Sequence, residues 1–315
     1  MNSRAMSKCR LLFLFLLVTP GIIIAQQYPV LDEYRINPGI LAPSFTGKSS
    51  LFQVYLTQRN EWTGIPGAPV TGAVNIEGSP FENMGLGTNI MLNKAGIVRY
   101  FSFSINYAYH LQLATYHFLH FGVSPCLYQN SIDLSNLVVS DQNDPVLNAS
   151  GKITETYINF GASLMYSYKT LNICFAFPYL FNNRSLYQDP QYSNYLTMGT
   201  NFQLYLNYML LFSKDWGLQF DVLYRNMQYT PWLIDAGVMI KYKESYWLGL
   251  LYRKGNTFAV NAGFCVANTF VLGYNYEFSG SAMMGKSGGT HEVTLGYSYQ
   301  GKHKKKALPL KVKDY

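Results

Sequence analysis

Large apolar and small or polar residues alternate along the stretch "RYFSFSINYAYH" at residues 99–110. The large members are Phe101, Phe103, Ile105, Tyr107 and Tyr109. The members between them are Ser102, Ser104, Asn106, Ala108 and His110. Successive side chains of a β-strand point to opposite faces, so this pattern predicts a strand with one large apolar face and one small polar face.

The same alternation recurs along the whole chain and predicts fourteen strands. They cover residues 51–58, 70–77, 85–93, 99–110, 116–124, 155–167, 170–178, 201–212, 215–225, 231–242, 245–253, 256–266, 269–278 and 290–299. An even number of strands, most of them near the ~9–11 residues that cross a bilayer when tilted, is typical of a bacterial outer-membrane barrel.

The connections between these strands sort into two classes. The long ones, at 125–154, 179–200 and 279–289, all follow an odd-numbered strand, whereas the connections on the other side, such as "YKES" and "VANT", are short. Outer-membrane barrels have long outer loops and short periplasmic turns. We therefore expect an all-β transmembrane antiparallel barrel whose large faces meet outer-membrane lipid. A soluble β-sandwich or propeller is the alternative, and it gives no reason for the sorting.

Composition supports a membrane barrel and adds an export signal. Aromatic residues make up 16% of the chain and charged residues only 13%, against about 25% charged in average soluble proteins. Residues 1–25 combine a basic start with the apolar run "LLFLFLLVTPGIII" and end at Ala25. This predicts a cleaved signal peptide. A transmembrane anchor is the alternative, but the run is short and is interrupted by Pro and Gly.

The remaining chain divides into three parts. Residues 26–48 are expected to form a periplasmic or lumen-entering segment, 49–299 the barrel, and 300–315 a basic periplasmic tail, with both termini periplasmic. The tail holds six lysines, so the basic balance of the chain comes from its ends and does not indicate nucleic-acid binding. The tail is either solvated or in contact with an acidic periplasmic partner.

Polar and charged residues occupy the predicted inner faces of the strands. The predicted lumen network consists of Asp221, Arg225, Asp235, Lys241, Arg253 and Glu277, and other inner positions are Glu77, Gln203, Gln219 and Glu292. The first alternative is a polar binding site or pore constriction. The second, which we favour, is a structural network of ion pairs that fills the lumen.

The sequence carries no recognisable catalytic or metal-binding motif, so we expect no enzyme, cofactor or metal. Three histidines lie near one predicted turn, at His110, His117 and His120, and we expect structural roles for them. Free thiols are expected at Cys126, Cys174 and Cys265, whose odd number and wide spacing fit no disulfide framework. Calcium binding by Asp133, Asp141 and Asp144 is an alternative to plain solvated acids.

Several stretches resemble the PorP/SprF family of type IX secretion system membrane proteins from Bacteroidota. They are "YRINPGILAPSFTG", "TQRNEWTGIPGAP", "FENMGLGTNIMLNKAG", "SIDLSNL" with a following "DP", and "GGTHEVTLGYSY". The matching positions are Asn37, Pro38, Gly47, Arg59, Trp62, Pro66, Pro69, Asn83, Gly85 and Gly87. The positions from Arg59 to Pro69 are expected in the first outer loop, and those from Asn83 to Gly87 at the turn into the third strand.

The resemblance implies a non-enzymatic outer-membrane component of type IX secretion. Its implied partners are a periplasmic lipoprotein with an OmpA-like domain and secreted or gliding-motility cargo with a C-terminal sorting domain. The alternatives are a barrel that conducts small solutes and an outer-membrane hydrolase that uses His120. The lysine-rich tail extends beyond the usual end of the family.

Overall fold

A computed structural model of the chain describes residues 29, 31–49, 52–134, 152–181, 200–228, 230–279 and 285–299. The predicted signal peptide and the basic tail lie outside the described residues. Within the described part, no helix is long and apolar enough to cross a membrane.

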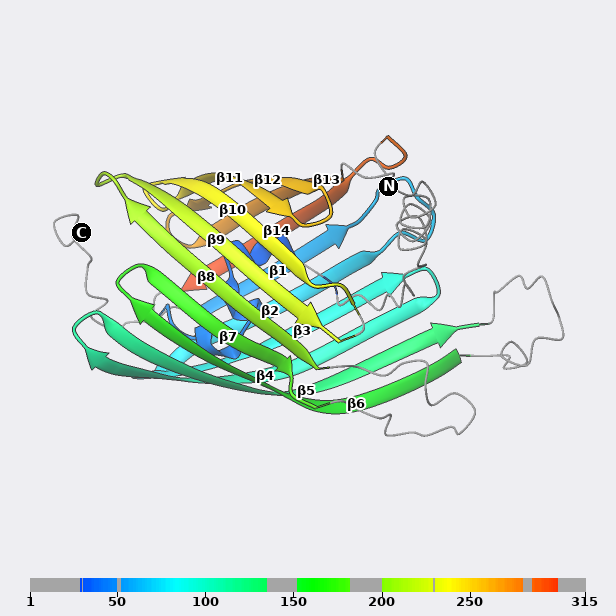
Figure 1. Ribbon diagram of the computed structural model, residues 1–315, viewed down its shortest axis with the longest axis horizontal. Helices are drawn as coiled ribbons and strands as arrows, with labels where there is room; N and C mark the ends of the chain where they lie inside the picture. Colours follow the sequence, from blue (N-terminus) through cyan, green and yellow to red (C-terminus); the bar gives the residue numbers. More distant parts are fainter. Residues whose placement is uncertain are drawn as a thin grey trace, which may run out of the picture.

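Fourteen antiparallel strands form one closed barrel, because each strand pairs with its neighbours in sequence and β1 also pairs with β14 (Figure 1). They are β1 Phe52–Asn60, β2 Val70–Phe81, β3 Met84–Ala95, β4 Val98–Ala114, β5 His117–Asp133, β6 Lys152–Tyr168, β7 Leu171–Tyr179, β8 Asn201–Leu211, β9 Trp216–Met227, β10 Leu233–Tyr242, β11 Tyr246–Arg253, β12 Thr257–Val266, β13 Phe270–Ser279 and β14 Thr290–Tyr299. Closure pairs the backbone polar groups around the sheet, as a bilayer requires. The predicted fold class and strand number are confirmed.

The alternating pattern places large side chains outside the barrel and small polar ones inside. In β4, Ile105 is 50% exposed, whereas its neighbour Asn106 is 1% exposed. Leu248 and Leu250 of β11 are likewise exposed, while Trp247 and Leu251, which flank this pair in the sequence, are buried. The large apolar faces thus form the outer surface of the barrel.

Strand β5 is longer than the sequence pattern predicts. The expected end at residue 124 is wrong, since the strand continues through Pro125 to Asp133 and pairs with β6 along its full length. Pro125 has no N–H group to donate to a ladder, and the β4–β5 pairing is interrupted between Ser104↔Cys126 and Tyr107↔Val123. The connection to β6 is therefore shorter than predicted and covers residues 134–151.

The two ends of the barrel differ in their connections. The end at which β1 begins carries short turns, and several non-glycine residues there adopt the positive φ that tight hairpin turns need: Asn83, Tyr116, Lys169, Lys243, Glu244, Ala267 and Asn268. We call this the short-turn end. The opposite end carries the connections at 61–69, 134–151, 180–200 and 280–289, and we call it the long-connection end.

Residues 31–49 lie inside the barrel, where Figure 1 shows them in dark blue, and we call them the plug. The plug contains three 3₁₀-helices, η1 Asp32–Arg35, η2 Pro38–Ile40 and η3 Pro43–Phe45. Two of them start with proline, whose fixed φ suits a first helical position. Most plug residues from Leu31 to Gly47 are buried.

Candidate functional site: the plugged lumen

An ion-pair cluster joins the plug to the barrel wall near the long-connection end. Arg253 at the end of β11 donates from Nη2 to Asp32 Oδ1 at 2.6 Å, from Nε to Asp235 Oδ1 at 2.9 Å, and from Nη1 to Glu277 Oε2 at 2.7 Å. Arg225 donates to the second oxygen of Asp235 at 2.7 Å. One plug carboxylate and two wall carboxylates thus share the guanidinium of Arg253.

Arg59 of β1 completes this cluster. It donates from Nη1 to Asp32 Oδ2 at 3.3 Å and to Glu292 Oε2 at 3.1 Å, and from Nη2 to Glu277 Oε2 at 2.9 Å. Its side chain is 2% exposed. Asp32 therefore bridges two wall arginines, and the planar guanidinium fork suits such multiple pairing better than a lysine would.

Two plug carboxyl groups have opposite electrostatic environments. Burial alone would raise the pKa of Asp32, but the charges of Arg253 and Arg59 hold it at about 2. Burial and the neighbouring Glu292 carboxylate raise the pKa of Glu33 to about 8, against a smaller lowering effect of the hydrogen bond from Asn37. Glu33 is therefore held neutral at pH 7 while Asp32 is held charged.

Amide groups connect η1 to the wall on the β2 and β14 side. Glu292 Oε1 accepts the backbone N–H of Glu33 at 2.8 Å. Asn37 donates to Glu33 Oε1 at 3.1 Å and to Asn75 Oδ1 at 3.0 Å. Asn37, one of the family-motif positions, thus fixes the plug against β2.

Arg35 reaches the opposite wall, at mid-height of the barrel. Its Nη2 donates to the carbonyl oxygen of Val238 at 3.0 Å, and its Nε lies 3.4 Å from Asp221 Oδ2. Glycines leave room for this guanidinium, because a Cβ on Gly249 would lie 3.0 Å from Nη2. The plug is thus held on both sides of the lumen.

The end of the plug that leads into β1 packs on glycines of the wall. A Cβ on Gly85 would overlap the carbonyl oxygen of Thr46, and one on Gly122 would overlap the backbone of Ser44. Gly47 adopts φ +67° beside Gly78 and Gly85. This close approach of two backbones requires residues without side chains.

Histidines also contact this part of the plug. His110 Nε2 lies 3.0 Å from the carbonyl oxygen of Thr46, and its Nδ1 lies 2.7 Å from Nδ1 of His120. His120 Nε2 lies 3.0 Å from Ser167 Oγ. The two inward histidines are occupied by contacts to the wall and the plug, whereas His117 contacts Tyr166.

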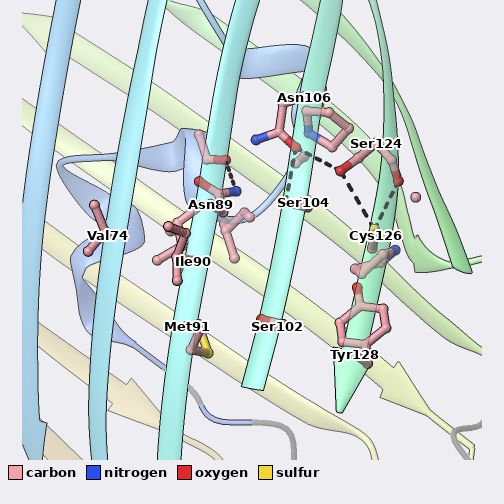
Figure 2. Close-up of a pocket in the computed structure, with 17 residues that line it drawn as sticks. Val74, Asn89, Ile90, Met91, Ser102, Ser104, Asn106, Ser124, Cys126 and Tyr128 are labelled. Carbon is pink, nitrogen blue, oxygen red and sulfur yellow. Dashed lines mark hydrogen bonds between the residues drawn. The ribbon is translucent and has the colours of Figure 1, made fainter. Parts of the chain in front are cut away.

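A small cavity remains between the plug and strands β2 to β7 (Figure 2). Its volume is about 60 Å³, and Asn106, Ser124 and Cys126 line one side, where Ser124 donates to Asn106 Oδ1 at 2.7 Å. A space of this size holds a few water molecules.

The predicted lumen network is only partly one cluster. Asp235, Arg253, Glu277 and Arg225 meet as described above. Asp221 instead faces Arg35 and accepts a hydrogen bond from Tyr205 at 2.6 Å. Lys241 lies towards the short-turn end of β10, away from this cluster. The alternating pattern does not predict the contacts of the charged plug residues Asp32, Glu33 and Arg35, and the only sequence signal for them is the charged run "DEYR" in the segment before the first strand.

The family-motif positions fall into two groups. Asn37, Pro38 and Gly47 are plug residues, and Gly85 and Gly87 line its path. The expected place of Arg59 in the first outer loop is wrong, because β1 extends to Asn60 and Arg59 points into the lumen. The loop does contain Trp62, Pro66 and Pro69, while Asn83 forms a short turn with φ 63°. The sequence predicted a loop position for Arg59 because the alternation of apolar residues stops before the strand ends.

The predicted thiols and acidic loop residues can be placed only in part. Cys126, Cys174 and Cys265 are free, as expected. Asp133 ends β5, whereas Asp141 and Asp144 lie outside the described residues. Among the described residues, no group of three or more potential ligands is placed to hold a metal ion.

The chain as a whole was compared with known families. A sequence model of the family described as "Type IX secretion system membrane protein PorP/SprF" matches residues 23–297. The chain belongs to this family. PorP/SprF membership makes it an outer-membrane component of type IX secretion. No curated protein matches the sequence.

Solved structures show the barrel likeness at low identity. Omp33 of Acinetobacter baumannii is 7% identical with a TM-score of 0.46, covering 80% of this chain and 99% of that one. The CymD monoaromatic hydrocarbon channel is 10% identical with a TM-score of 0.49, covering 89% and 95%. The Pseudomonas putida toluene transporter TodX is 10% identical with a TM-score of 0.47, covering 87% and 95%.

Proposed function

We propose that this PorP/SprF chain is a closed, non-enzymatic barrel that couples the periplasmic type IX apparatus to secretion or surface attachment of cargo with a C-terminal sorting domain. The observation that carries the proposal is the plug, which is bonded to the wall from Asp32 to Lys48. A lumen filled and ion-paired in this way suits an anchor or scaffold better than a solute channel.

The difference between the two ends of the barrel supports contacts with partners both outside the cell and in the periplasm. By the rule that outer-membrane barrels carry long loops outside and short turns inside, the long-connection end faces the exterior. The chain then leaves β14 at Tyr299 on the periplasmic side. The basic tail would start there, where a lipoprotein with an OmpA-like domain is the proposed partner.

The inward histidines support the proposal that the protein is no enzyme. His110 and His120 hold each other, the plug and Ser167. A hydrolase of this chain would need His120 free for catalysis. Hydrolysis of ester or peptide substrates in detergent that is lost in His120→Ala would overturn this part of the proposal.

The test of the function is a gentle-detergent pull-down of the tagged, full-length protein from its native outer membrane, followed by mass spectrometry. We expect a peptidoglycan-binding lipoprotein, ring components or cargo with a C-terminal sorting domain. The same preparation is then placed in a planar bilayer, where we expect no conductance. Recovery of the barrel alone together with steady open-channel currents would instead establish a small-solute channel.

A further inference from the structure

The N-terminal end of the plug lies at the long-connection end of the barrel. Leu31 packs in one buried cluster with Tyr100, Tyr128 and Tyr179. Tyr100 stands two residues after the start of β4 at that end, and Tyr179 is the last residue of β7 there. Strands β5 and β7 both run towards this end, where they finish at Asp133 and Tyr179.

Asp32 confirms this placement from the opposite side of the barrel. Its two arginine partners stand at strand ends, since Arg253 is the last residue of β11 and Arg59 the last but one of β1. Both strands run towards the long-connection end. The cluster therefore lies just below that mouth.

The other end of the plug lies at the short-turn end. Lys48 Nζ donates to Ser167 Oγ at 3.2 Å and also to Asn172 Oδ1. Ser167 is the last but one residue of β6, and Asn172 is the second residue of β7, so both flank the short turn between these strands. The plug therefore crosses the lumen from mouth to mouth, with its N-terminal end at the long-connection end.

We propose that the barrel presents the N-terminal end of its plug to the cell exterior, although its first strand starts on the periplasmic side. Pro29 stands two residues before Leu31, a span of at most about 7 Å, so it reaches the outer mouth. This replaces the sequence-based expectation of a periplasmic N-terminus. A partner that contacts Pro29 would then be extracellular, and the plug, tethered to β1 at the short-turn end, could be withdrawn only towards the periplasm.

This inference rests on the orientation given under the proposed function, so the experiment tests the two separately. Single cysteines are introduced as Pro29→Cys, Ser49→Cys and Lys286→Cys in full-length protein in which Cys265 is replaced by serine. Ser49 is exposed at the short-turn end, and Lys286 is exposed in the connection before β14. Intact cells are treated with a polyethylene-glycol maleimide too large for outer-membrane porins, and permeabilised cells serve as the comparison.

We expect Pro29→Cys and Lys286→Cys to react in intact cells, and Ser49→Cys to react only after permeabilisation. The inference would be overturned, and the orientation left intact, if Lys286→Cys but not Pro29→Cys reacts in intact cells. In that outcome Pro29→Cys must react after permeabilisation or after unfolding in detergent. Reaction of Ser49→Cys but not Lys286→Cys in intact cells would overturn the orientation. The Cys265→Ser parent, whose Cys126 and Cys174 are buried, gives the background.

Discussion

Arg253 and Asp32 are 221 positions apart in the chain, and their side chains meet at 2.6 Å inside the barrel. The contact joins the wall to the plug, so it depends on barrel closure and on plug insertion at the same time. A buried ion pair is not in itself a sign of high stability, because both charges lose their hydration. It does make plug docking sensitive to any change in either partner.

Asp32→Asn is the mildest change that tests this contact. The amide keeps the size of the side chain but removes the charge that bridges Arg253 and Arg59. Both arginines retain other carboxylates, so we expect a moderate loss of about 2 kcal/mol, typical of hydrogen bonds to charged groups. The thermal unfolding midpoint in detergent should fall. Asp215→Asn, at an exposed short turn, is the matched control, and an equal fall in both variants would contradict the bridging role.

Arg253→Lys and Arg253→Met separate charge from geometry at the same position. Lysine keeps the charge but has one nitrogen in place of the three that reach Asp32, Asp235 and Glu277. Methionine leaves these buried carboxylates with too few cations, and removing one partner of a buried pair typically costs about 3–5 kcal/mol. We expect the order wild type, lysine, methionine in thermal stability. Equal stability of lysine and wild type would show that only the charge matters.

The raised pKa of Glu33 predicts that the folded protein loses stability as the pH rises. Its pKa is raised from 4.5 to about 8 by burial and by Glu292, so its neutral form stabilises the folded state. This contribution is complete below about pH 4.5 and is lost as the pH rises through about 8. Each pH unit in that window is worth about 1.4 kcal/mol, and we expect about 3 kcal/mol less stability at pH 9 than at pH 6 from this group.

Glu33→Gln isolates that contribution. The amide stays neutral at every pH and still accepts the hydrogen bond from Asn37. The difference between their unfolding midpoints at the two pH values therefore reports the titration of Glu33 together with its interaction with Glu292. Parallel curves for wild type and variant would show that Glu33 is charged in the folded protein.

The sequence predicted the wall of this protein far better than its interior contacts. Period-two alternation is a local property, so it located all fourteen strands, and Ile105 and Asn106 face the sides that it assigns. It gave the wrong strand ends at two places. Strand β5 continues through Pro125, where the predicted strand ends, and β1 extends past Arg59, which was predicted to lie in a loop. The plug contacts could not be predicted, because pairs such as Arg35 with Asp221 depend on which part of the wall a non-periodic segment meets.

Glycine substitutions give the sharpest test of the plugged lumen. An alanine Cβ at Gly85 would overlap Thr46, and one at Gly122 would overlap Ser44, both in the plug. Neither change removes a strand hydrogen bond, so the barrel should still close while the plug is displaced from its seat, at a cost typical of overpacking, about 1–3 kcal/mol. We expect both variants to conduct ions in planar bilayers that wild type leaves silent. Gly72→Ala, whose Cβ would meet nothing nearer than 3.6 Å, should stay silent, and silence of all three variants would show that the plug seat does not control conductance.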